Sequence, residues 1–252
     1  MNSNHYFSKQ FDIQSHLVDN NFKMQIQPLM GCMQTVADEH VDSFQMGWKE
    51  LHQQNFFWVI YRFGLQIFRM PKKYDRITIT TWANPPMNVI QPRNFRITDN
   101  DGELLIQAHT LWTILDSEKF ATHSLQDVMN EKLTSNLVDD DRVEMNLKIP
   151  KITLPQDWQA PIHPVLYSDL DYNQHVNNTA YSRWLLDSYP IDFINSHDLK
   201  GLIINYTQQA RIGDRYAIYT HKETETEHCS LIYNTDTLKE ICKLRTTWGR
   251  KN

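Results

Sequence analysis

One succession of elements occurs twice in this chain, and it constrains the fold more than any other feature. The stretch K-Y-D-R-I-T-I-T around Asp75 matches I-G-D-R-Y-A-I-Y around Asp214. Each is followed by two further strand-like stretches that end at a tryptophan, Trp112 in the first half and Trp248 in the second. A stretch with helical spacing precedes the strands in each half. One helix followed by four strands, repeated in tandem, predicts an α+β fold with antiparallel sheets.

The first half begins with weak alternation over residues 1–27, which predicts an opening strand with a polar turn at Asp19-Asn20-Asn21. A helix is predicted from Leu29 to about Gln54, with Pro28 at its first position and Gly47 ending or bending it. One face of this helix is apolar and typical of a core rather than of a cofactor site. Its members are Leu29, Met33, Val36, Ala37, His40, Val41 and Phe44.

Alternation and β-branched residues predict the strands of the first half over residues 56–71, 75–82, 94–98 and 104–115. The sequence D-N-D-G from Asp99 to Gly102 predicts a hairpin between the last two. Residues 126–160 are charged and contain several prolines, so they are predicted to connect the halves. A second helix is predicted over 177–196, kinked or broken at Pro190.

Composition excludes several classes of protein. The 252 residues include only seven glycines, and none of these form a phosphate-binding glycine motif. A net charge of −5 argues against a general nucleic-acid surface. Three scattered cysteines fit a reducing compartment, and the chain shows neither a signal peptide nor an apolar run long enough to span a membrane. We therefore expect a cytoplasmic protein that does not enter a membrane, with no metal and no cofactor.

The residues that point to chemistry lie between Val165 and Pro190. Alternating polar residues end just ahead of the predicted second helix, where backbone N–H groups and the positive end of the helix dipole are expected. Asn177 or Asn178 is the expected N-cap of that helix. The polar positions are Asp169, Asp171, Asn173, His175, Asn177 and Asn178. Such residues also serve as ordinary turns and caps, so the pattern alone leaves a structural and a catalytic interpretation open.

The motif D-x-N-x-H-V-N-N-x-x-Y, with a tryptophan three residues later, resembles the signature of acyl-ACP thioesterases, where ACP is the acyl carrier protein. W-V-I-Y-R, I-F-R-M-P and the R-x-F-x-I-x-D-x-x-G pattern from Arg93 to Gly102 resemble blocks of the same family, so the resemblance covers most of the chain. It implies a double hotdog, two tandem repeats each of a long helix wrapped by an antiparallel sheet. The domains are then expected at 1–135 and 136–252, the first holding the acyl chain and the second the catalytic residues.

The resemblance implies catalytic roles for Asp171, Asn173 and His175 in hydrolysis of an acyl thioester. His175 can act as a base near neutral pH, and Asn173 can hold a water molecule or the thioester carbonyl. Asp171 can orient the cluster or, if desolvated, act as the base itself. The N–H groups around Val176, Asn177 and Asn178 are the candidate donors to the oxyanion.

One family element differs in this chain. The plant enzymes carry a segment resembling L-E-Y-R-R-E-C, whose Glu-Cys pair has been given catalytic roles, and here the segment from Ile204 to Ala210 reads I-N-Y-T-Q-Q-A. Gln209 stands at the glutamate position and Ala210 at the cysteine position. A nucleophilic cysteine is therefore excluded at position 210, and Gln209 can hold a water molecule but cannot accept its proton. We interpret this difference to mean that water attacks the thioester directly, with Asp171 or His175 as the base. The alternative is that the protein has lost much of its activity.

The leading hypothesis is a thioesterase that releases fatty acid from acyl-ACP and ends chain elongation. The alternatives are a thioesterase acting on acyl-CoA and a hotdog protein that binds acyl chains without turnover. Trp58 is the expected substrate-binding residue of the first domain, and Lys72, Lys73 and Arg76 could contact the acidic carrier protein. The sequence leaves open the acyl chain length and whether the protein is a monomer or a homodimer.

Overall fold

The computed structural model describes residues 5–251, and they divide into two compact units after Met145. The division into domains at 135/136 stays a prediction. In the structure, residues 138–143 pack on the first unit, where Val138 and Val143 contact Trp82. Asp141 accepts two hydrogen bonds from Arg96 there, at 2.6 and 2.9 Å.

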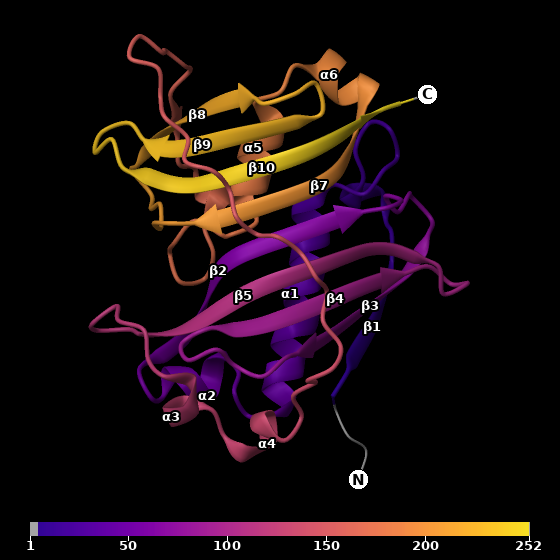
Figure 1. Cartoon of the computed structure of the whole chain (residues 1–252), viewed down its shortest axis with the longest axis vertical. Coiled ribbons are helices and arrows are strands. Elements are labelled where there is room, and N and C mark those ends of the chain that lie inside the picture. Colours follow the sequence, from indigo (N-terminus) through magenta and orange to yellow (C-terminus); the bar gives the residue numbers. More distant parts are fainter. Residues whose placement is uncertain (1–4, 252) are drawn as a thin grey trace. The chain divides into compact units, whose positions relative to one another are not determined.

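The first unit is an antiparallel sheet in the order β1-β3-β4-β5-β2, with helices packed against it (Figure 1). Its elements are β1 (Phe7–Asp12), the 3₁₀ turn η1 (Ser15–Leu17), α1 (Ile26–Ser43), α2 (Trp48–His52), β2 (Phe56–Ile67), β3 (Arg76–Ala83), β4 (Gln91–Thr98), β5 (Leu104–Asp116), α3 (Leu125–Val128) and α4 (Glu131–Thr134).

The long helix α1 follows the pattern expected from its sequence. All seven residues of the predicted apolar face are buried, which confirms its orientation toward the core. The helix ends earlier than predicted, at Ser43, and Gly47 is the N-cap of the separate helix α2. The predicted hairpin after β4 is confirmed, since Gly102 has a φ of +81° and donates to the Asp99 carbonyl at 3.2 Å.

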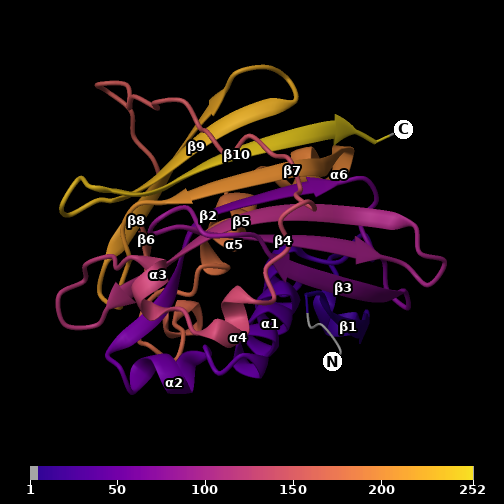
Figure 2. The ribbon, with the colours of Figure 1, turned by 60° about the horizontal axis from the view of Figure 1, so that its bottom comes forward.

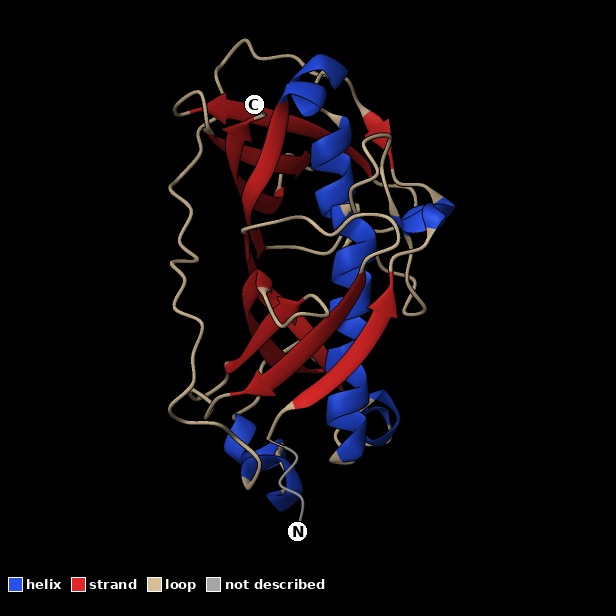
Figure 3. Ribbon diagram, turned by 90° about the vertical axis from the view of Figure 1, so that its right-hand side faces the viewer, coloured by secondary structure: helices blue, strands red, loops and turns tan. Residues whose placement is uncertain are grey.

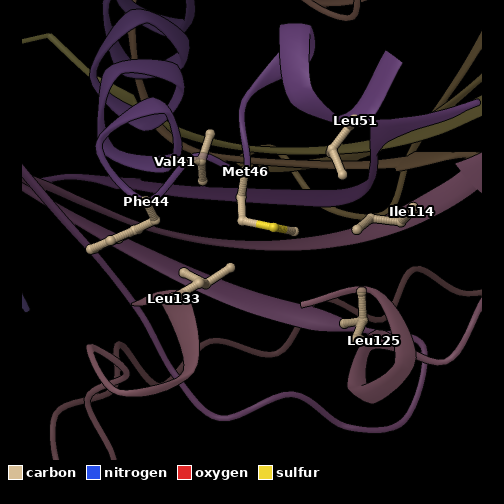
Figure 4. Close-up of a cluster of buried hydrophobic side chains, with 7 residues drawn as sticks. All are labelled: Val41, Phe44, Met46, Leu51, Ile114, Leu125 and Leu133. Carbon is tan, nitrogen blue, oxygen red and sulfur yellow. The ribbon is translucent and has the colours of Figure 1, made fainter. Parts of the chain in front are cut away.

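The short helices α2, α3 and α4 gather near one end of α1 (Figure 2). A hydrophobic cluster joins them to the sheet through Ile114 of β5 (Figure 4). Its buried members are Val41, Phe44, Met46, Leu51, Ile114, Leu125 and Leu133. Trp58 of β2 packs against this cluster and donates from Nε1 to the Met46 carbonyl at 3.0 Å. Residues 135–162 contain no helix or strand and follow a tan trace in Figure 3.

The second unit repeats this plan with the sheet order β7-β10-β9-β8-β6, also antiparallel. Its elements are β6 (His163–Pro164), η2 (Tyr167–Asp169), α5 (Ala180–Asp187), α6 (Ile191–Ser196), β7 (His197–Tyr206), β8 (Arg215–Lys222), β9 (Glu227–Asn234) and β10 (Glu240–Arg250).

The predicted break at Pro190 is confirmed, since α5 ends before it and α6 follows it. The predicted start at Asn177 is wrong, because α5 begins only at Ala180. The side chain of Asn177 does bond just ahead of the helix, where its Oδ1 accepts from the Thr179 N–H and hydroxyl at 2.9 and 2.8 Å. Within residues 5–251, none of the helices has the length and apolar character that crossing a membrane requires.

Candidate functional site

The polar motif of the second half folds into a tight loop between η2 and α5. An antiparallel bridge joins Leu170 to Val176 across the base of the loop. The Asp171 N–H donates to the His175 carbonyl at 2.8 Å, and the Gln174 N–H donates to the Asp171 carbonyl at 3.1 Å. Gln174 turns the chain with a φ of +62°. The loop therefore places Asp171 and His175 opposite each other.

The carboxylate of Asp171 is used inside this loop. Its Oδ1 accepts from the Asn173 N–H at 2.8 Å and from the His175 N–H at 3.2 Å. An aspartate that bonds backbone groups two and four residues later holds its own turn closed. The Asn173 side chain is exposed and has no hydrogen-bond partner among the described residues.

His175 is half-buried and lies beside a cation. Burial lowers the pKa of its imidazole, the charge of Arg211 lowers it further, and the charge of Asp171 opposes both. A backbone bridge pairs His175 with Arg211, which explains their proximity. Because an unperturbed imidazole titrates near 6.5, a lowered pKa keeps His175 neutral and able to accept a proton at pH 7.

Replacing Arg211 by Gln is expected to raise the pKa of His175, because one of the two influences that lower it is removed. The imidazole then becomes protonated at a higher pH than in the unsubstituted protein. NMR titration of the His175 ring measures this shift directly. The matched control is Arg215→Gln, since Arg215 bonds to Asp236 on the surface and does not influence His175. A pKa unchanged by Arg211→Gln would contradict the electrostatic explanation.

Two of the three candidate oxyanion donors are occupied within the fold. The Val176 N–H donates to the Ala210 carbonyl at 3.0 Å, and the Asn177 N–H donates to the Asp169 carbonyl at 2.7 Å. The Asn178 N–H has no partner within residues 5–251, while its carbonyl accepts from the Tyr206 hydroxyl at 3.0 Å. Asn178 is thus the backbone position of this set that can still donate.

The segment that carries Gln209 runs beside the loop. Ala210 is buried, and its N–H donates to the Tyr181 hydroxyl at 3.2 Å while its carbonyl receives the Val176 N–H. The side chain of Gln209 is exposed and makes no hydrogen bond to any part of the chain that the structure describes. The backbone contacts of Ala210 hold this segment beside the loop that carries Asp171, Asn173 and His175.

A buried carboxylate anchors the loop to α5. Asp169 is 1% exposed. Its side chain accepts from Arg183 and from Trp184 Nε1, the latter at 3.1 Å, and also from the Leu166 N–H at 2.7 Å. Trp184 stacks on Tyr216 of β8 with ring centroids 3.8 Å apart. These contacts fix the start of the loop relative to the helix and the sheet.

The first unit contains the same loop at the turn predicted for Asp19-Asn20-Asn21, although its likeness to the loop of the second half was not predicted. Asp19 Oδ1 accepts from the Asn21 N–H at 2.8 Å and the Lys23 N–H at 3.0 Å, and Phe22 has a φ of +59°. The Asp19 N–H donates to the Lys23 carbonyl at 2.8 Å, as Asp171 does to His175. The spacing D-x-N-x-K at 19–23 was the available signal. Lysine occupies the position of His175, so the loop alone is structural and the imidazole is what distinguishes the second unit.

Trp58, the predicted substrate-binding residue of the first half, lines a pocket inside the first unit. Its cavity volume is about 30 Å³. Its lining consists of Ala37, Asp38, Val41, Trp58, Ala83, Gln91, Arg93, Trp112 and Leu133. Most of these side chains are apolar.

Comparisons with known proteins match nearly the whole chain. Residues 4–133 match the model of the acyl-ACP thioesterase N-terminal domain, and residues 156–250 match that of the C-terminal domain. An acyl-[acyl-carrier-protein] hydrolase from Cuphea viscosissima is 25% identical over 98% of this chain, which spans only 63% of that relative's length.

Two solved structures share the fold. An acyl-ACP thioesterase from Bacteroides thetaiotaomicron superposes with a TM-score of 0.88 at 20% identity, covering 98% of both chains. A 12:0-ACP thioesterase from Umbellularia californica gives a TM-score of 0.85 at 22% identity, again covering 98% of both. At these identities the likeness concerns the fold alone, and it confirms the predicted double hotdog.

Proposed function

The chain belongs to the acyl-ACP thioesterase family, and from that premise we propose that it hydrolyses the thioester of acyl-ACP and releases a free fatty acid. Release of the acid removes the acyl chain from its carrier and ends elongation. The observation that carries the proposal is the half-buried imidazole of His175, kept neutral by burial and by Arg211, on a loop whose counterpart carries Lys23. A neutral imidazole can take a proton at pH 7, whereas a lysine ammonium is already protonated and cannot accept another.

In the proposed mechanism His175 is the general base. It removes a proton from a water molecule as the water oxygen attacks the thioester carbonyl carbon. The carbonyl oxygen becomes an oxyanion, which the Asn178 N–H stabilises. When the tetrahedral intermediate collapses, the carbon–sulfur bond breaks, and the imidazolium returns its proton to the departing thiolate of the carrier protein.

The contacts of Asp171 support a positioning role for it in this mechanism. Its Oδ1 is shared between two backbone N–H groups, and Asp19 does the same in the loop that has no histidine. Asn173 and Gln209 carry exposed amides that can each hold the water molecule or the thioester carbonyl without titrating. We therefore assign proton transfer to His175 and placement of the reactants to these amides.

A cysteine nucleophile is not part of the proposal. Burial raises the pKa of Cys229 to about 12 and that of Cys242 well above its ordinary value. Burial also raises the pKa of Cys32. The thiolate is the nucleophilic form of cysteine, so at neutral pH these three side chains are poor nucleophiles.

The acyl carrier protein is the proposed partner. The pocket beside Trp58 is the proposed site of the acyl chain. Carrier protein is acidic, and Lys72 and Arg76 are exposed on the first unit. Arg76 already bonds to Asp12 at 2.6 Å, so Lys72 and Lys73 are the better candidates for this contact. Location in the cytoplasm and a monomeric or dimeric state remain predictions.

Steady-state hydrolysis of a series of acyl-ACPs beside the matching acyl-CoAs tests the proposal. Turnover of the acyl-ACPs with a much lower kcat/KM on acyl-CoA is the expected result, and the series also gives the chain-length preference. A preference for acyl-CoA would move the protein to the other thioesterase class. Tight binding of uncleaved acyl-ACP would instead indicate an acyl-binding protein in which Gln209 marks a lost function.

A further inference from the structure

The carbonyl of Asn178 has a hydrogen-bond donor that helix α5 does not supply. The ladder of helical bonds begins with the carbonyl of the N-cap, Thr179, so the carbonyl of the residue before it lies outside the ladder. The hydroxyl of Tyr206, the last residue of β7, donates to the Asn178 carbonyl at 3.0 Å. Burial raises the pKa of Tyr206 well above its ordinary value, so the hydroxyl keeps the proton that it donates.

A second tyrosine supports the ring of Tyr206. Tyr181 of α5 packs against it edge to face, with ring centroids 5.7 Å apart. The hydroxyl of Tyr181 accepts from the Ala210 N–H at 3.2 Å, and the Ala210 carbonyl accepts from the Val176 N–H at 3.0 Å. The ring that supports Tyr206 is thereby tied to the segment that runs beside the His175 loop.

The peptide between Asn178 and Thr179 is held at both ends. Its carbonyl accepts from the Tyr206 hydroxyl, and its N–H donates to Asn177 Oδ1 at 2.9 Å. The preceding peptide is held as well, because the Asn177 carbonyl accepts from the Ala180 N–H at 2.9 Å. Asn178 therefore lies between two fixed peptides, which gives its N–H a defined position.

The loop of the first unit and the segment beside it correspond position by position to those of the second. Matching positions make the same backbone contacts. These contacts are the bridge of Lys23 to Lys72 and that of His175 to Arg211, and the bond of the Met24 N–H to the Pro71 carbonyl and that of the Val176 N–H to the Ala210 carbonyl. The correspondence gives an internal comparison for Asn178 and Tyr206.

Counted from these contacts, Ile26 takes the place of Asn178 and Ile67 that of Tyr206. The helix of the first unit begins at Ile26, whereas α5 begins two residues after Asn178. A helical carbonyl bonds within its own helix and needs no side-chain donor, and Ile67 has no polar atom to offer one. The first unit thus builds the same loop without a tyrosine hydroxyl, and the hydroxyl occurs in the unit that has the imidazole of His175.

These contacts matter for catalysis because a donor to an oxyanion is effective only from a fixed position. We propose that Tyr206 is a positioning residue of the thioesterase reaction, which holds Asn178 where the N–H of that residue meets the oxyanion. The inference rests on the proposed function for the reaction itself. Without the hydroxyl the Asn178 carbonyl loses its donor and the peptide can move, and a misplacement of about 1 Å can cost ~100-fold in rate.

The variant Tyr206→Phe removes the hydroxyl and keeps the ring. Its kcat for acyl-ACP hydrolysis is expected to fall at least ~10-fold with KM changed less than ~2-fold, because the oxyanion donor acts in the transition state. The pH at which kcat is half-maximal should stay that of the unsubstituted enzyme, since His175 is still the base. A shifted midpoint would assign the Tyr206 hydroxyl to proton transfer and overturn the positioning role. Circular dichroism and thermal unfolding check that the variant is folded in the assay.

Tyr189→Phe is the matched control, because it removes another buried tyrosine hydroxyl of the second unit, one that bonds to Thr246 and His228. Its kcat is expected to stay near that of the unsubstituted enzyme. A loss in Tyr189→Phe as large as in Tyr206→Phe overturns the proposal, because any buried hydroxyl of the unit would then have the same effect.

Asn177→Ala is a second test that leaves Tyr206 in place. It removes the bond at the other end of the same peptide, the one from the Thr179 N–H. Its kcat is expected to fall with KM little changed, for the same reason. An unchanged kcat in Asn177→Ala overturns the proposal even if Tyr206→Phe does not fold.

The unsubstituted protein separates this inference from the thioesterase proposal. If it hydrolyses no acyl-ACP, both are overturned, since there is then no reaction for Tyr206 to serve. Hydrolysis by the unsubstituted protein that is undiminished in folded Tyr206→Phe overturns the positioning role alone and leaves the thioesterase proposal intact.

Discussion

Replacing His175 by Gln is expected to reduce kcat for acyl-ACP hydrolysis at least ~100-fold, the usual lower bound for loss of a general base. Glutamine keeps a polar side chain of similar reach but cannot take the proton from water. The base acts in the transition state, so the loss should fall on kcat with KM little changed. Steady-state kinetics with the preferred acyl-ACP measures both parameters.

Two further variants make this result specific. Lys23→Gln changes the equivalent position of the matching loop in the first unit and is expected to leave kcat near that of the unsubstituted enzyme. Asp171→Asn keeps an oxygen that can accept from the Asn173 and His175 N–H groups but removes the basic carboxylate. A loss in Asp171→Asn as large as in His175→Gln would assign the base to Asp171 and contradict the mechanism proposed above.

The sequence predicted the fold well because the fold repeats. Two weak patterns of helix and strands that agree with each other carry more information than either alone, and the antiparallel α+β class follows from them. The errors lie at element ends. Asn177 bonds to Thr179, and α5 begins only at Ala180 rather than at the predicted Asn177. Such local competition between side chain and backbone is not visible in the spacing of apolar residues.

The candidate site was predicted as a set of residue types, and its geometry was not. Nothing in the motif indicates that Val176 and Asn177 use their N–H groups inside the fold, since the acceptors are the Ala210 and Asp169 carbonyls. The turn at Asp19-Asn20-Asn21 was predicted, but its likeness to the second loop was not, because it has lysine where the motif has histidine.

The two polar residues that β4 contributes to the pocket, Gln91 and Arg93, could not be predicted from the chain. The strand was predicted to begin only at Asn94. In the structure β4 begins at Gln91. Proline has no N–H to donate within a sheet, but β3 pairs with β4 only as far as Arg93, so Pro92 leaves no β3 carbonyl without its donor. Gln91 and Arg93 therefore fall on one face of a strand whose beginning the sequence concealed.

Replacing Asp169 by Ala is expected to cost about 3 kcal/mol of unfolding free energy, at the lower end of the range for removing one partner of a buried ion pair. The substitution leaves Trp184 Nε1 and the Leu166 N–H without their acceptor, and it removes the partner of Arg183. The cost stays at the lower end because the Arg183 side chain is 34% exposed and can be hydrated. Denaturant unfolding followed by tryptophan fluorescence measures the change.

Asp187→Ala is the matched control, because Asp187 contacts the same Arg183 at 3.6 Å from a side chain that is 67% exposed. An exposed pair of this kind contributes about 0.3–0.5 kcal/mol, so this variant should unfold almost as the unsubstituted protein does. Equal effects of the two substitutions would mean that burial adds nothing to the Asp169 contacts. Asp169→Ala should also reduce turnover, because the Asp169 carboxylate ties the segment that leads into the His175 loop to Arg183 and Trp184 of α5.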